Sequence, residues 1–181
     1  MEVKFKKCVY CGFDFKPKYK TTERACSVRC AIAYAQEKEK KLAQREWQRE
    51  KKKLKEKIMS HKDWLNILQK VFNAYIRARD KGKPCISCGC QVESGHASHM
   101  FSVGGNPNVR FNEDNCHLSC IECNLHKHGN LVEYTLRLPE RIGKERFEKL
   151  VNDSKKTVLK LSIPEIKNLI KEYKEKTKSL I

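Results

Sequence analysis

Eight of the ten cysteines fall into four closely spaced pairs, and they carry the clearest chemistry in the chain. Paired cysteines on a tight turn present two thiolates, and two such pairs supply the four ligands of a tetrahedral structural zinc site. The spacing therefore predicts two Zn²⁺ sites. The ligands of the first are Cys8, Cys11, Cys26 and Cys30, and those of the second are Cys85, Cys88, Cys120 and Cys123.

The second set has the ligand layout of a treble-clef zinc site, since 31 residues separate Cys88 from Cys120 and the segment after Cys123 can form a helix. Cys90 and Cys116 lie outside both sets. Cys90 could replace Cys88 as a ligand, and the sequence alone does not decide between them. A competing interpretation is that these are unliganded buried thiols, but cysteine pairs at this spacing seldom are.

Histidine and asparagine gather between and just after the cysteine pairs of the second set. Hydrolysis of a phosphodiester needs a base that activates water and a cation that neutralises the charge developing on the phosphate. An imidazole has an unperturbed pKa near ~6.5, so its neutral form is available at cellular pH. The residues gathered there include His96, His99, Asn115, His117, Asn124, His126 and His128.

The sequence around these residues is similar to known nuclease families. The run from His96 to Asn130 is HASHMFSVGGNPNVRFNEDNCHLSCIECNLHKHGN, and it resembles the ββα-metal, or HNH, nuclease motif. The segments CISCG, RFNEDN and CNLHKHGNLVEY, with the N-terminal cysteines and the charged segment after them, resemble the phage NinG (Rap) recombination proteins over nearly the whole chain. A looser similarity is to phage recombination endonuclease VII. These resemblances imply action on branched DNA, such as Holliday junctions and D-loops.

The resemblance also implies a role for each residue. His99 matches the general base, and Asn124 matches a ligand of a catalytic Mg²⁺ or Mn²⁺. Asn115 matches the residue that braces the hairpin. The sequence departs from the common pattern at Ser98, where many members have Asp or His beside the base, so the metal shell is incomplete.

Two histidines are candidates to complete that shell. His96 matches a position near the metal in the endonuclease VII pattern, and we expect it to be a substitute ligand or a phosphate contact. His126 is a second candidate. On an ideal helix, however, Asn124 and His126 differ by about 200°, so both face one ion only if the helix starts late or is distorted. We therefore rank Asn124 above His126.

The chain is strongly basic, with 39 Lys and Arg against 22 Asp and Glu and a net charge of +17. Such a surface attracts polyanions, and we expect DNA as the partner, with Arg110 and Lys127 as candidate phosphate contacts. No run approaches the roughly 20 apolar residues that span a bilayer, and no membrane partner is expected. The cysteines are paired as metal ligands are, and the sequence shows no apolar signal stretch. We therefore expect the protein in the reducing cytoplasm of a bacterial host cell.

The expected fold is a small α+β arrangement. A ββα-metal core held by zinc is flanked by helices, and a long charged helix joins it to a separate N-terminal zinc module. Periodicity and capping residues predict helices over 31–58, from Ser60 to about Gly82, over 139–152 and over 162–176. The expected domains are 1–30 (zinc module), 31–58 (charged arm), 59–138 (nuclease core) and 139–181 (C-terminal helices).

The predicted function is metal-dependent endonucleolytic cleavage of branched DNA in phage recombination. Phage or host recombination proteins are expected partners, and a homodimer is possible through the arm or the C-terminal helices. One alternative is a zinc-finger protein that binds DNA without cutting it, since the cysteines and the charge suit that equally well. Another is a restriction or homing HNH enzyme.

Overall fold

A computed structural model of the chain describes residues 4–18, 22–156 and 160–180, and its contacts divide the chain into two units, Met1–Met59 and Ser60–Ile181. Helices and two small antiparallel sheets make up the described elements, which confirms the α+β class. The first unit holds β1 (Lys6–Lys7), β2 (Asp14–Phe15) and α1 (Val28–Ile58). The second holds α2 (His61–Arg79), β3 (His96–His99), η1 (Pro107–Val109), η2 (Glu113–Asn115), β4 (Cys116–Ser119), η3 (Glu122–His126), α3 (Leu131–Ile142), α4 (Lys144–Ser154) and α5 (Ile163–Ser179).

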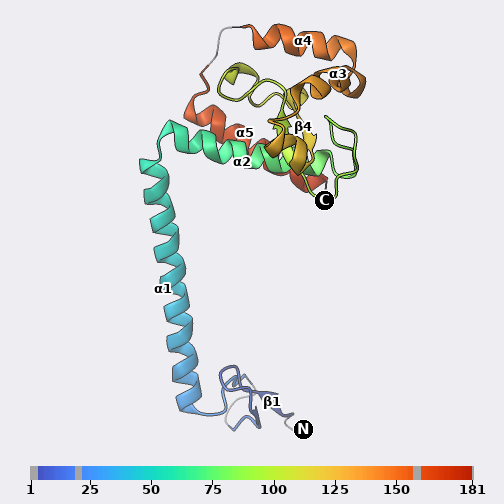
Figure 1. Cartoon of the computed structure of the whole chain (residues 1–181). Helices are drawn as coiled ribbons and strands as arrows, with labels where there is room; N and C mark the ends of the chain where they lie inside the picture. Colours follow the sequence, from blue (N-terminus) through green and yellow to red (C-terminus); the bar gives the residue numbers. More distant parts are fainter. Residues whose placement is uncertain (1–3, 19–21, 157–159, 181) are drawn as a thin grey trace. The chain divides into compact units, whose positions relative to one another are not determined.

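Helix α1 is 31 residues long and buries none of its side chains. Figure 1 shows it as one continuous helix. It is rich in strong helix formers and contains neither Gly nor Pro. Ser27 caps its N-terminus, because the serine hydroxyl accepts a hydrogen bond from the backbone N–H of Cys30 at 3.2 Å. The helix predicted over 31–58 is therefore confirmed, with a start slightly earlier, at Val28. In the described part of the chain, no helix is long and apolar enough to cross a membrane.

Helices α2 and α5 lie side by side and bury aromatic residues between them (Figure 1). Each begins with a capping box, formed by Ser60 with Asp63 and by Ser162 with Glu165, as the sequence predicts. The rings of Phe72 and Tyr173 meet edge to face, with centroids 5.0 Å apart. Local caps thus set where these helices start, and their apolar faces hold them together.

Strands β3 and β4 form the hairpin on which the candidate site depends. They pair antiparallel, with His96 opposite Ser119 and His99 opposite Cys116. A long loop, residues 100–115, connects them. Tyr134 of α3 has no exposed surface, and its hydroxyl donates to the backbone carbonyl of Ser98 at 3.1 Å, so α3 is fixed against the hairpin.

Asp80 joins the end of α2 to the same hairpin. Its carboxylate is fully buried and accepts hydrogen bonds from Arg79, from Lys83 and from the backbone N–H of Leu118 in β4. Burial by itself raises the pKa of Asp80, but the cationic groups of Arg79 and Lys83 lower it to about 2. The buried charge is therefore paired and fully hydrogen-bonded.

The predicted helix over 139–152 is wrong. Two helices, α3 and α4, cover this region and meet at Gly143, whose φ of 89° lies in the left-handed region that favours glycine. A proline favours the first turn of a helix, which is why the sequence predicts a start at Pro139. Instead Pro139 lies in the last turn of α3, because burial of Tyr134 and Leu138 extends the helix in the other direction.

Replacing Asp80 by Asn should lower the free energy of unfolding by about 3 kcal/mol at pH 7, because one member of a buried, charged network is lost. The folded pKa of Asp80 lies below that of an unfolded Asp, so this stabilisation is present above about pH 4 and is lost as the pH falls towards 2. Urea denaturation across that range should show the two proteins converging in acid.

The matched control is Glu133→Gln, which removes a carboxylate from a partly exposed pair with Arg137. It should cost less than about 0.5 kcal/mol. An Asp80→Asn protein as stable as the control would contradict the role given to Asp80.

Candidate functional site

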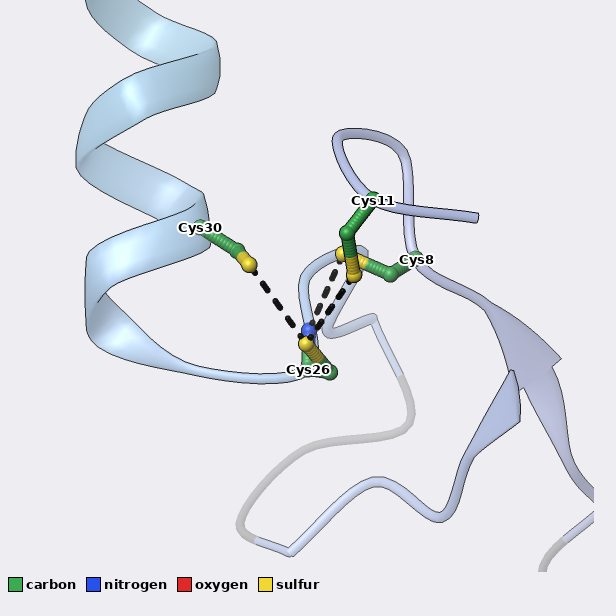
Figure 2. A group of neighbouring side chains, drawn as sticks. All are labelled: Cys8, Cys11, Cys26 and Cys30. Atoms are coloured by element: carbon green, nitrogen blue, oxygen red, sulfur yellow. Dashed lines mark hydrogen bonds between the residues drawn. The ribbon is translucent and has the colours of Figure 1, made fainter. Parts of the chain in front are cut away.

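The four thiols of the first cysteine set point towards one another (Figure 2). Their sulfur atoms all lie within 4.8 Å of one another, with Cys30 on the first turn of α1. Backbone N–H groups of Cys11 and Cys26 lower the pKa of the Cys8 thiol to about 6, so the thiolate is favoured there. Gly12, with a φ of 75°, allows the tight turn after the first pair.

The second set converges in the same way, from the loop after α2 and the segment after β4. The sulfur atoms of Cys85, Cys88, Cys120 and Cys123 also lie within 4.8 Å of one another. Burial raises the pKa of the Cys85 thiol, but hydrogen bonds from backbone N–H groups outweigh this effect and lower the pKa to about 6. One of these donors is the backbone N–H of Cys120, at 3.3 Å. This cluster links the chain before the hairpin to the chain after it.

Both clusters fit a zinc ion. Four sulfur atoms this close cannot all carry charge unless a cation lies among them, because like charges at such distances repel. Thiolates are the ligands that structural zinc prefers, and four of them complete its tetrahedron. Each set could therefore hold one Zn²⁺, whose contribution would be to cross-link its two segments.

The geometry favours Cys88 over Cys90 as the fourth thiol. Cys88, and not Cys90, belongs to the group of four sulfur atoms that all lie within 4.8 Å of one another. The thiol of Cys88 donates to the sulfur of Cys90, with 3.3 Å between the two sulfur atoms, so Cys90 lies beside the cluster. Cys116 lies apart from the cluster, buried at the start of β4.

His96 and Asn124 are brought together across the hairpin. The side-chain amide of Asn124 donates to Nδ1 of His96 at 3.0 Å, and both residues are half-buried. Asn124 lies in η3, a π-helical turn that begins one residue before Cys123. The second cysteine cluster therefore sets the position of Asn124 relative to the hairpin.

His99 lies three residues further along β3 and so projects from the opposite face to His96. Its Nε2 lies 3.1 Å from the backbone carbonyl of Arg110, and its Nδ1 lies 3.5 Å from the thiol of Cys116. Burial lowers the pKa of His99, so the imidazole is neutral at pH 7. A neutral ring that donates through Nε2 carries its lone pair on Nδ1, facing Cys116.

Asn115 is completely buried at the end of the long loop. Its side chain accepts from the backbone N–H of Phe101 at 2.8 Å, and donates to the carbonyls of Phe101 and Val109. Its bonds therefore close the loop between the two strands.

Three further predicted residues are His126, Lys127 and Arg110. His126 and Lys127 are exposed, and the ammonium of Lys127 is 3.8 Å from the carboxylate of Glu122. The guanidinium of Arg110 is half-buried and donates to the side chain of Gln69 at 2.7 Å. The side chain of Lys127 is therefore more open to a phosphate than that of Arg110.

Sequence reasoning did not find the contacts around Ser98. Ser98 is buried, and its backbone carbonyl accepts from the hydroxyl of Tyr134, which also contacts Nδ1 of His117 at 3.1 Å. Burial lowers the pKa of His117 to about 3, so this histidine is neutral. No local pattern signals such a network, because Tyr134 lies 36 residues from Ser98 in sequence.

A basic stripe on α1 is a candidate interface for DNA. Five exposed cations recur at helical spacing of three or four residues, and so lie along one face. Glu39, Glu46 and Trp47 project from other parts of the helix surface. Among the described residues of α1, the ion pair found is Lys41 with Glu37, so most of these cations are open to a polyanion. The stripe consists of Lys38, Lys41, Arg45, Arg49 and Lys52.

Comparison with known proteins gives a family match over the whole chain. A family described as Bacteriophage Lambda NinG protein matches residues 1–181. Protein ninG of Escherichia phage lambda is 39% identical over 118 residues, which are 65% of this chain and 57% of the relative. Protein ninG of Salmonella phage P22 has the same identity and coverage.

A third relative, protein ninG of Enterobacteria phage H19B, is 41% identical over 88 residues, or 48% of this chain and 44% of the relative. The chain thus spans less than two thirds of the length of the relatives it matches. No solved structure matches the chain.

The two clusters predict two Zn²⁺ per folded chain, measurable by metal analysis of the purified protein. Chelation should unfold at least the second unit, since the thiols that link its segments would lose their cation. Cys88→Ser should lower the zinc content to one per chain, whereas the matched variant Cys90→Ser should retain two. Equal loss in the two variants would contradict the ligand assignment.

Proposed function

The chain belongs to the NinG family, and from that premise we propose that it is a metal-dependent endonuclease acting on branched DNA in phage recombination. The observation that carries the proposal is the contact between His96 and Asn124 beside the second cysteine cluster. It provides an imidazole nitrogen and an amide beside each other on a hairpin and helical turn, an arrangement that resembles the HNH, treble-clef core.

The donor set suits a divalent cation that is shared with the substrate. Asn124 would contribute its amide oxygen after rotation of the side chain, and His96 would contribute Nδ1. Both donors are neutral, and Ser98 stands where a carboxylate would add charge. Few protein ligands leave positions for water and phosphate oxygens, and an imidazole favours Mn²⁺ over Mg²⁺. When bound, such a cation neutralises phosphate charge and acidifies bound water.

In this proposal His99 is the general base. Its neutral form predominates at pH 7 because burial lowers its pKa. The carbonyl of Arg110 fixes the tautomer by accepting from Nε2, which leaves Nδ1 to receive a proton. Cys116 must give way before Nδ1 reaches a water molecule, since its thiol lies 3.5 Å away.

The surroundings of His99 also support a second candidate function, a zinc protein that binds branched DNA without cutting it. Both ring nitrogens of His99 have protein partners, and the strand projects it away from His96. In that case His99 stabilises the packing of β3 against Phe72, whose ring centroid is 6.1 Å away. Activity measurements on variants separate the two functions.

Substitution of His99 by Ala should reduce cleavage of a four-way junction by about 10²–10⁴-fold while leaving DNA affinity largely unchanged. His96→Ala and Asn124→Ala should instead raise the Mn²⁺ concentration needed for cleavage. Because burial lowers the pKa of His99, the acidic limb of the rate profile should lie below about pH 6.5.

The control is His128→Ala, an exposed histidine near the same turn, which should cleave like the unaltered protein. Full activity in a folded His99→Ala protein would remove His99 from the mechanism. Absence of cleavage in the unaltered protein with Mg²⁺ or Mn²⁺, on both junction and linear DNA, would favour the non-catalytic function.

We assign selectivity for branched DNA to the first unit. A small core contacts too little DNA to sense a junction, whereas α1, about 46 Å long at ~1.5 Å per residue, offers a second contact for another duplex leg. Once the second unit binds one duplex leg, the linked helix has a high effective concentration near a second leg. A junction offers that second leg and a linear duplex does not, so the junction is favoured.

A truncated protein beginning at Ser60 should therefore retain metal-dependent nicking but lose most of its preference for four-way junctions.

A triple substitution in the full chain, in which Arg45, Arg49 and Lys52 are replaced by Gln, should reduce that preference. The matched triple change of Lys40, Lys51 and Lys57, which has the same charge but lies off the stripe, should reduce it less. Competition binding between a four-way junction and a linear duplex measures the preference of the truncated protein and of both triple variants. Unaltered selectivity after truncation would place the selectivity in the second unit.

A further inference from the structure

A small polar cleft lies in the second unit, away from the His96–Asn124 pair. It encloses about 160 Å³ and is formed by the end of α2, the loop after it, η2, β4 and the junction of α3 with α4. Four cationic side chains and three carboxylates line it. The lining residues are Arg79, Asp80, Lys83, Glu113, Asp114, His117, Arg141, Ile142 and Arg146.

The carboxylates of the cleft are already neutralised by partners. Asp80 is held by Arg79 and Lys83. Glu113 accepts from the hydroxyl of Tyr75 at 2.7 Å and from the ammonium of Lys176 at 2.9 Å.

Asp114 is bound by Nε and Nη2 of Arg146, which leaves Nη1 of that arginine for another acceptor. No carboxylate of the lining is therefore left to pair with the fourth cation, Arg141.

Arg141 is the cation left over. Its Nη2 donates to the backbone carbonyl of Pro84 at 3.0 Å. Its Nη1 is buried and has no acceptor among the described residues. A buried donor without an acceptor loses its hydration and gains nothing in return, so such groups in proteins usually have a partner.

We infer that this cleft binds a phosphate group, held by Arg141 with Lys83 and Arg146. Water could satisfy one N–H group, but it would leave the excess positive charge of Arg141 unbalanced. The cleft has room for roughly five waters at ~30 Å³ each, which is enough for one tetrahedral oxyanion. A guanidinium group presents paired N–H donors that match two phosphate oxygens.

A DNA backbone phosphate and free inorganic phosphate have the same chemistry, and the assignment to DNA rests on the proposed function. Lys83 and Arg146 are partly exposed, with 46% and 62% of their side-chain surface open, so a backbone phosphate can approach. The cleft would then hold DNA at a point separate from the site of cleavage. Cleavage is not needed to test this, and the inference can fail while the proposed nuclease activity holds.

The test compares the full zinc-loaded protein in sodium phosphate and in sodium chloride of equal ionic strength, with no added divalent metal. Phosphate should raise the thermal midpoint saturably in the unaltered protein, and this rise should be absent in Arg141→Met. The matched control is Lys149→Gln, which removes an exposed charge from α4 and should keep the rise. No phosphate-specific rise, or an equal rise in Arg141→Met, would overturn the inference.

Two further measurements distinguish the sources of phosphate and guard against an unfolded variant. Phosphorus NMR on the unaltered protein should show inorganic phosphate binding that duplex DNA displaces. Arg141→Met should reduce the salt dependence of duplex binding by about one counterion, while Lys149→Gln should leave it nearly unchanged. Phosphate binding that DNA does not displace would overturn the assignment to DNA.

Discussion

The convergence of four thiols from either side of the β3–β4 hairpin is the constraint on which the second unit depends. Two of them come from the loop after α2 and two from the segment after β4, so one cation there would close the ends of the hairpin onto each other. Such closure would add a cross-link to the apolar core that α2 and α5 form with their aromatic residues. Asn124 follows the last thiol directly, and the same closure therefore brings it to His96.

A second set of interactions fixes the two strands and the loop that connects them. Asp80 accepts from β4, Asn115 closes the long loop, and the hydroxyl of Tyr134 reaches the backbone of β3. All three side chains are fully buried, and each bonds to backbone groups that would otherwise lack partners. The strands are thus held by polar contacts along their length and by thiols beyond their open end. The candidate site lies on a rigid frame.

The geometry separates two residues that the family resemblance groups together. His96 and His99 lie close in sequence, yet strand alternation sends them to opposite faces, one to Asn124 and one to Cys116. The metal-binding role proposed for His96 and the base role proposed for His99 therefore belong to two different faces of β3. The proposed phosphate contacts divide likewise, since the α1 stripe is solvated whereas Arg141 is held against the core.

The sequence by itself determined the features that depend on local chemistry. The cysteine spacing predicted both four-cysteine clusters. Two helix starts were predicted from the pairs Ser60 with Asp63 and Ser162 with Glu165, because a helix cap uses neighbouring residues. Only the tertiary structure decided what depends on distant partners. It ended α3 at Gly143 and placed Cys88 rather than Cys90 in the second cluster. It also put the Cys116 thiol beside His99 and left Arg141 without a carboxylate partner. These outcomes follow from burial against residues far along the chain, which no local pattern encodes.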